Sequence, residues 1–201
     1  MAEKVFWGVV GAMGVMFTAA TVNHKVRSTL FGFEGAGVVG LDPTLVLPGD
    51  MHTTTHLVAF WGVGKNERIL SFPGGKCEIF DLFPAFRLWH DKFSYPIARV
   101  TAAREYREET GIFIDPRDLK DHVVTGHGKT TTGMPVVWFT AYVSSPYLYP
   151  PRATGEFSSA AVLQRIDNPK DFRKFNRASF PAMRNAVNSR VGHNAIPEME
   201  E

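Results

Sequence analysis

Three glutamates have a spacing that would place their carboxylates on one side of a helix. Glu105 and Glu109 lie four residues apart, and Glu108 lies three residues after Glu105, so a helix brings all three onto one arc. Like charges at this spacing cost a helix roughly a few tenths of a kcal/mol per pair. Carboxylate oxygens are hard ligands that suit Mg²⁺ or Mn²⁺, and such an ion would relieve the repulsion and bind substrate phosphates.

The elements that must position these acids can be predicted from the surrounding pattern. A helix is predicted from about Ile97 to Thr110, with Gly111 as its left-handed stop. Ala102 and Tyr106 occupy the neighbouring arc of this helix, which can pack against a sheet. The alternative is an ordinary solvated helix face, because REYREE has a common surface composition.

Short apolar runs between turn residues predict strands before and after this helix. They begin near Gly35, His56, Ile69, His122 and Pro135, and a last one is predicted near 160–163. A long loop-like stretch is expected after Pro73-Gly74-Gly75, and a basic amphipathic helix over about 169–190, broken at Pro181. Strands around a central helix, followed by another helix, predict an α/β fold with a mixed sheet.

The composition bounds the class of protein. The chain has 201 residues, of which 44% are hydrophobic and 21% charged, as in a folded domain of ordinary size. Its formal net charge is only +2, which gives no general argument for nucleic acid as a partner. The single cysteine, Cys77, excludes an internal disulfide and a cysteine-based zinc site. We interpret Cys77 as a packing residue, and its reduced state fits a cytoplasmic protein.

An uncharged run of eighteen residues, Val5 to Val22, lies near the N-terminus. Its length is at the lower limit for a membrane-spanning helix, but Gly8, Gly11 and Gly14 dilute its hydrophobicity. We expect residues 1–30 to form an apolar strand or helix that packs on the domain of residues 31–201. The alternative is a membrane anchor, in a protein whose acidic helix has no role beyond forming part of the surface.

The segment from Arg104 to Ile112, REYREETGI, resembles the second half of the Nudix box. That signature is G-x5-E-x7-R-E-U-x-E-E-x-G-U, where U is apolar, and every specified position of its second half is met. Upstream, Phe72 to Lys76 resembles the strand end and glycine turn that open the box. The resemblance extends over roughly residues 35–163 and implies a Nudix-like α/β/α sandwich with a mixed β-sheet.

The first half of the box departs from the pattern. After Gly75 and five intervening residues (76 to 80), the chain has Asp81 where the family has Glu. Twenty-two residues (82 to 103) then precede Arg104 instead of 7, so 15 are extra. An aspartate can still hold Arg104 by a salt bridge. The insertion, at about 82–100, is aromatic and partly basic. It either covers the substrate and supplies a stacking surface for a base, or packs as a surface loop without ligand contact.

The resemblance implies hydrolysis of a nucleoside diphosphate linked to another group, by attack of water on a pyrophosphate phosphorus. It implies Mg²⁺, with Mn²⁺ as a substitute, and more than one ion during turnover. Arg104 would orient Glu105. Glu105 and Glu109 are the two strongest expected metal ligands. The metal ligands implied are Glu105, Glu108, Glu109 and the backbone carbonyl of Gly74.

Three further residues are candidates outside the box. Glu156, in a Thr-Gly-Glu turn before the last strand, is a candidate general base, and its alternative is a solvent-exposed loop glutamate. His127 follows a strand and is a second candidate for the base or for substrate contact, although a lone loop histidine is more often structural. Lys129 nearby could contact a phosphate or be solvated.

The sequence leaves the substrate open among a nucleotide sugar, a dinucleotide, a nucleoside triphosphate and a capped RNA end. The basic tail gives no specific indication of RNA, since solvated amphipathic helices share its composition. The competing function is a catalytically weakened Nudix-fold module that binds a nucleotide, which the split box and Asp81 motivate. The intact glutamates argue against it. A homodimer is compatible with the sequence, and a membrane partner is not favoured.

Overall fold

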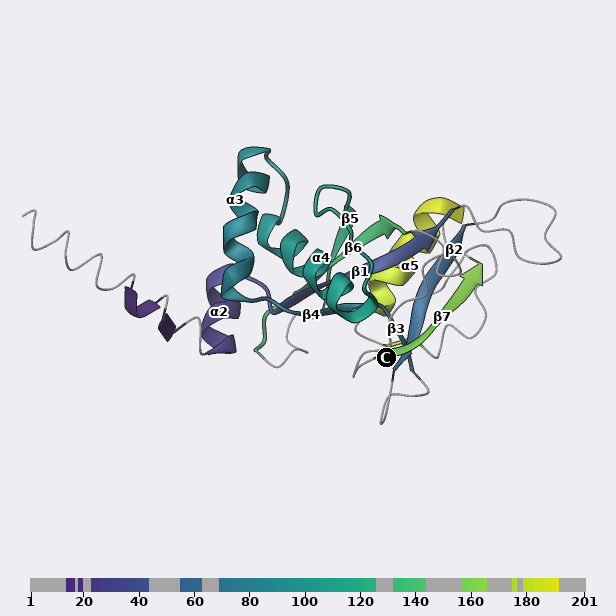
Figure 1. Cartoon of the computed structure of the whole chain (residues 1–201), viewed down its shortest axis with the longest axis horizontal. Helices are drawn as coiled ribbons and strands as arrows, with labels where there is room; N and C mark the ends of the chain where they lie inside the picture. The colour runs from purple at the N-terminus through teal and green to yellow at the C-terminus, as the bar shows by residue number, and fades with distance from the viewer. Residues whose placement is uncertain are drawn as a thin grey trace, which may run out of the picture.

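A mixed sheet lies at the centre of the computed structural model, which describes residues 14–16, 18–19, 23–43, 55–62, 69–125, 132–143, 157–165, 175–176 and 179–191. Its path runs β3-β2-β1-β6-β5, with β4 paired to β1 and β7 paired to β2 (Figure 1). β1 and β6 are parallel, and the other pairs are antiparallel. The strands are β1 Gly35–Asp42, β2 His56–Gly62, β3 Leu70–Ser71, β4 Gly74–Lys76, β5 Lys120–Thr125, β6 Val136–Tyr142 and β7 Phe157–Arg165.

Strand β1 is buried along its whole length, which explains its continuous run of apolar and small residues. Val38 faces the core on one side of the sheet, and Val39 and Leu41 face the core on the other. Alternation along the strand therefore divides the interior into two layers, and each layer needs a helix to cover it.

Helix α4, Pro96–Thr110, covers one face of the sheet, and helix α5, Phe180–Val191, covers the other. Tyr106 of α4 is fully buried among the residues of the first layer, and Met183 of α5 is fully buried in the second. The expected α/β/α sandwich with a mixed sheet is confirmed. Helix α4 matches the helix predicted over about 97–110, and Gly111 ends it with a left-handed φ of 76°.

The insertion is helical, so the expectation of a long loop-like stretch after Gly75 is wrong. A 3₁₀ turn, η2 (Ile79–Asp81), leads directly into α3, Leu82–His90. Ala85 and Leu88 are buried on the side of α3 that packs with the α4 layer. Their three-residue spacing is a helical period, and Pro84 lies in the first turn, where its missing N–H leaves no hydrogen bond unmade.

The tail helix differs from the sequence prediction in its start. Pro181 does not break a helix over 169–190, because it occupies the first turn of α5, a position that proline suits. Phe175 instead forms a β-bridge with Leu70. Residues 169–174 lie outside the described residues.

The N-terminal region contributes helix α2, His24–Phe31, which Asn23 caps by accepting hydrogen bonds from two backbone amides. Ser28 is buried, and Phe31 packs on the α4 layer. Of the uncharged run Val5 to Val22, only residues 14–16 and 18–19 are described. Within the described ranges, no helix has both the length and the hydropathy needed to cross a bilayer.

Candidate functional site

Two carboxylates of α4 lie against the glycine turn that forms β4. The backbone N–H of Gly74 donates to Oε2 of Glu109 at 3.0 Å. The carboxylate of Glu105 packs so closely on Gly75 that a Cβ placed there would collide with it. The structure thus brings together the acidic stripe and the glycine turn, which the sequence separates by about thirty residues.

Small residues make this approach geometrically feasible. Gly74 pairs with Gly37 across the antiparallel β1–β4 ladder. A Cβ added at Gly74 would lie 2.7 Å from the Gly37 Cα, which only glycine tolerates. Strand β4 therefore lies close to β1, directly beside α4, where its backbone can meet the two carboxylates.

Arg104 connects the acids of the site to one another. Its Nε and Nη2 donate to the two oxygens of Asp81 at 2.9 and 3.2 Å, and Nη1 donates to Glu105 at 2.8 Å and Glu108 at 3.0 Å. Its Nη2 also donates to the Lys76 carbonyl at 2.9 Å. These contacts use all five N–H groups of the guanidinium, so Arg104 is a positioning residue with no donor left for a substrate.

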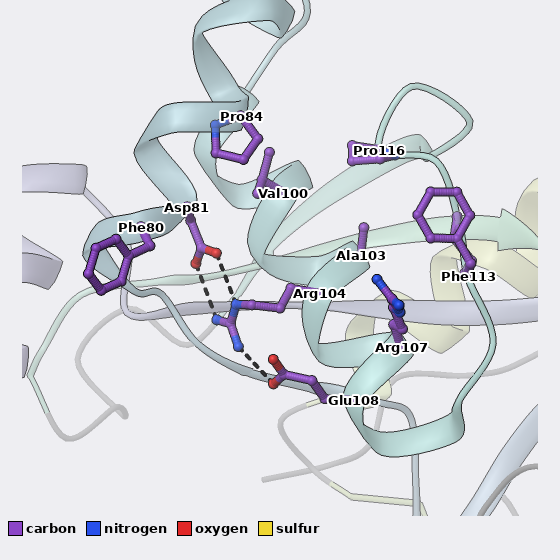
Figure 2. A pocket seen from close by; sticks show the side chains of 11 residues that line it. Phe80, Asp81, Pro84, Val100, Ala103, Arg104, Arg107, Glu108, Phe113 and Pro116 are labelled. Carbon is purple, nitrogen blue, oxygen red and sulfur yellow. Dashed lines mark hydrogen bonds and ion pairs between the residues drawn. The ribbon is translucent and has the colours of Figure 1, made fainter.

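Asp81 is buried at the junction of η2 and α3, with 3% of its surface exposed. Besides the fork from Arg104 (dashed lines in Figure 2), its Oδ2 accepts from the Thr101 hydroxyl and the Glu78 backbone N–H, each at 2.8 Å. The expected Asp81–Arg104 salt bridge is therefore present despite the insertion. The η2 turn places the Asp81 backbone close to the Arg104 guanidinium. The aspartate side chain, although shorter than that of glutamate, therefore reaches Arg104.

The electrostatics of the site favour the arrival of a cation. Burial raises the pKa of Glu105, and the negative charges of Glu108 and Asp81 act in the same direction, while Arg104 opposes them. For Arg104, burial alone would lower the pKa, but the hydrogen bonds and charge of Asp81, with those of Glu105, raise it above its usual value. An ion bound beside Glu105 would favour its carboxylate form.

The donor set fits a divalent ion that needs few protein ligands. Within the described ranges, no three His, Cys, Asp or Glu side chains come close enough to hold an ion by themselves. Mg²⁺, however, is often bound by one or two carboxylates together with water and substrate phosphates. Glu105 and Glu109 can supply that pair. Glu108 pairs with Arg104, but its side chain is 58% exposed. An ion could therefore reach its carboxylate from solvent.

The predicted site residues and the site residues found in the structure do not fully overlap. Glu156, His127 and Lys129 lie outside the described residues, so their roles stay predictions. Thr101 was missed as a member of the site, and so was Arg107, which lines the groove described below. Thr101 precedes Arg104 by three residues, a spacing that puts both on one helix face and could have indicated it.

Comparison with solved structures identifies the fold. A NUDIX hydrolase from Alicyclobacillus acidocaldarius superposes with a TM-score of 0.51 at 14% identity, covering 80% of this chain and 93% of that one. A C. elegans Ap4A hydrolase complex gives 0.47 at 12% identity, covering 78% and 98%. A MutT NUDIX hydrolase from Burkholderia pseudomallei gives 0.43 at 19%, covering 74% and 93%.

No protein-family model matches the chain, and no curated protein sequence does so either. At these identities the likeness shows the fold and not the activity. The first of the three structures confirms that the chain has the fold of Nudix hydrolases, a mixed sheet with flanking helices, as the resemblance of the box implied.

Proposed function

We propose that this protein is a Mg²⁺-dependent Nudix-type pyrophosphohydrolase that cleaves the phosphoanhydride bond of a nucleoside diphosphate linked to another group. The observation that carries the proposal is the pair of carboxylates, Glu105 and Glu109, set against the Gly74–Gly75 turn. The Nudix fold and the intact second half of the box support it.

The proposed metal site uses the donors that α4 and β4 bring together. Glu105 and Glu109 would hold Mg²⁺, or Mn²⁺ in its place, with Glu108 and the Gly74 carbonyl as further ligands. The ion would neutralise charge on the phosphates and supply an activated water. The chain contributes positioning: Arg104 holds Glu105 and Glu108, and is itself held by Asp81.

The general base and the substrate class belong to the same proposal. Glu156 and His127 are the proposed alternatives for the base, and Lys129 for a phosphate contact. A nucleotide sugar, a dinucleotide, a nucleoside triphosphate and a capped RNA end are the substrates to test, and the cytoplasm is the expected location. The competing function is a module that binds a nucleotide without turnover.

The test is a hydrolysis screen of these four classes with Mg²⁺, Mn²⁺ or EDTA, with products identified by ³¹P NMR. We expect metal-dependent release of a phosphomonoester product from at least one class. Asp118→Asn, which changes an exposed acid outside the site, should leave the rate unchanged. Nucleotide binding without turnover under every metal condition would overturn the enzyme in favour of the binding module.

A further inference from the structure

The outer side of α4, facing away from the sheet, carries a groove of about 530 Å³ beside the candidate site (Figure 2). Val100 and Ala103 form its floor. Phe80 of η2 and Pro84 of α3 form one wall, and Phe113, with Ile114 and Pro116, forms the other. The insertion and the helix it precedes therefore enclose an apolar space that neither would form alone.

Arg99 fixes this second wall to the helix. Its buried guanidinium donates to the carbonyls of Ser94, Pro116 and Leu119 and lies 5.0 Å from the centre of the Phe93 ring. One buried side chain thus ties the end of the insertion and the segment after α4 to the same turn of α4. The wall of the groove that follows α4 is therefore fixed to the helix by buried hydrogen bonds.

A cation without an assigned partner points into the groove. Arg107 is exposed, and no ion pair or hydrogen bond joins its side chain to another described residue. Figure 2 shows its guanidinium directed between Ala103 and Phe113. Arg104, one turn earlier, has all its donors used. A guanidinium beside apolar and aromatic walls suits a planar ring that carries an anionic group.

The groove lies next to the candidate site, and Arg104 and Glu108 belong to both. Arg104 and Glu108 line the groove, and Arg104 also binds Glu105. We expect a ligand whose diphosphate lies at Glu105 and Glu109 to extend past Arg104 toward the groove. Pro84 of the insertion lines this groove, which favours the interpretation that the insertion contacts the substrate.

We propose that this groove binds the nucleoside of the substrate, with its aromatic base against Phe113 and a phosphate oxygen facing Arg107. The proposal rests on the function proposed above, which it extends by naming a base-binding subsite. Stacking tolerates different bases, so the groove would favour aromatic over non-aromatic groups without strong base selectivity.

Titration with adenosine monophosphate in metal-free buffer, followed by NMR of the Val100 and Ile114 methyl groups, tests the subsite directly. We expect shifts of these methyl signals, and binding about tenfold weaker in Phe113→Ala and in Arg107→Ala. Phe86→Ala, an exposed aromatic of α3 outside the groove, and Arg117→Ala, an exposed cation, are the matched controls and should bind like the wild type. Ribose 5-phosphate, which lacks the base, should bind at least tenfold more weakly than the mononucleotide.

The outcomes separate the subsite from the hydrolase. Binding that is absent at millimolar ligand, or equally affected by the groove variants and their controls, would overturn the subsite even if the protein hydrolyses nucleotides. Mononucleotide binding that depends on Phe113 and Arg107, in a protein that hydrolyses nothing, would keep the subsite and overturn the hydrolase. If both hold, Arg107→Ala should raise KM about tenfold with kcat within twofold.

Discussion

The guanidinium of Arg104 donates two hydrogen bonds, at 2.9 and 3.2 Å, to the carboxylate of Asp81, which lies 23 residues earlier in the chain. The pair closes the insertion at its base: η2 and α3 leave the sheet at Asp81, and α4 returns the chain to it. The pair therefore ties the two ends of the segment that splits the box to each other.

Removing Asp81 should destabilise the fold. Asp81→Ala leaves the Arg104 guanidinium without its main partner in a largely buried site, and we expect a loss of about 3 kcal/mol in the free energy of unfolding. Urea denaturation measures it. Asp91→Ala is the control, because Asp91 forms an exposed pair with Arg117 at 3.8 Å that contributes at most about 1 kcal/mol. Equal losses in the two variants would contradict this role of Asp81.

A methyl group at Gly75 should displace Glu105. The added Cβ would collide with both carboxylate oxygens, so the side chain must leave its position beside β4. We expect Gly75→Ala to lower kcat at least about tenfold, since a misplaced charged group costs transition-state stabilisation. Gly14→Ala is the control, because a Cβ at Gly14 meets nothing within 4 Å. Full activity in Gly75→Ala would show that Glu105 need not lie against the turn.

Cys77 should make stability fall at high pH. Burial raises the pKa of its thiol from 9.0 to about 11, so between these values the native state holds a proton that the unfolded state releases. The contribution is complete below pH 9 and is lost as the pH rises through 11. We expect the stability of the wild type to decrease more steeply than that of Cys77→Ala over this range, measured by denaturation at fixed pH. Parallel curves would contradict the burial of the thiol.

Arg99 should not be replaceable by lysine. Its fork binds three carbonyls and its plane lies 5.0 Å from the rings of both Phe93 and Phe139, a geometry that an ammonium cannot reproduce. We expect Arg99→Lys to lower the free energy of unfolding by about 2 kcal/mol, determined by chemical denaturation. Arg117→Lys on the surface should change it by less than about 0.5 kcal/mol. An unchanged free energy of unfolding in Arg99→Lys would show that the three carbonyls find other donors.

The parts of the fold that follow regular periods were predictable from sequence. Strand β1 is an apolar run because both its faces are buried, and α4 ends at Gly111 because glycine adopts the left-handed stop at low cost. Helix α3 was not predicted, since Phe83 and Phe86 face solvent rather than the core, which hides the helical stripe formed by Ala85 and Leu88.

The candidate site was predictable only in part. The helical spacing predicted that Glu105 and Glu109 share a face, and the resemblance to the Nudix box implied that the Gly74 carbonyl lies beside them. The hydrogen bonds from Thr101 and Arg104 to Asp81 join α4 to η2 through tertiary packing, which no local pattern encodes. The same holds for the groove, whose walls come from both sides of the helix.

Glu109, which accepts a hydrogen bond from the Gly74 N–H, is proposed to take part in metal-dependent hydrolysis. The most direct test compares the Mg²⁺-dependent turnover of wild type and Glu109→Gln on the best substrate of the screen, with unfolding curves confirming that both are folded. We predict a loss of kcat of about two orders of magnitude or more. Turnover that is retained within a few-fold in a folded Glu109→Gln would show that Glu109 has no such role.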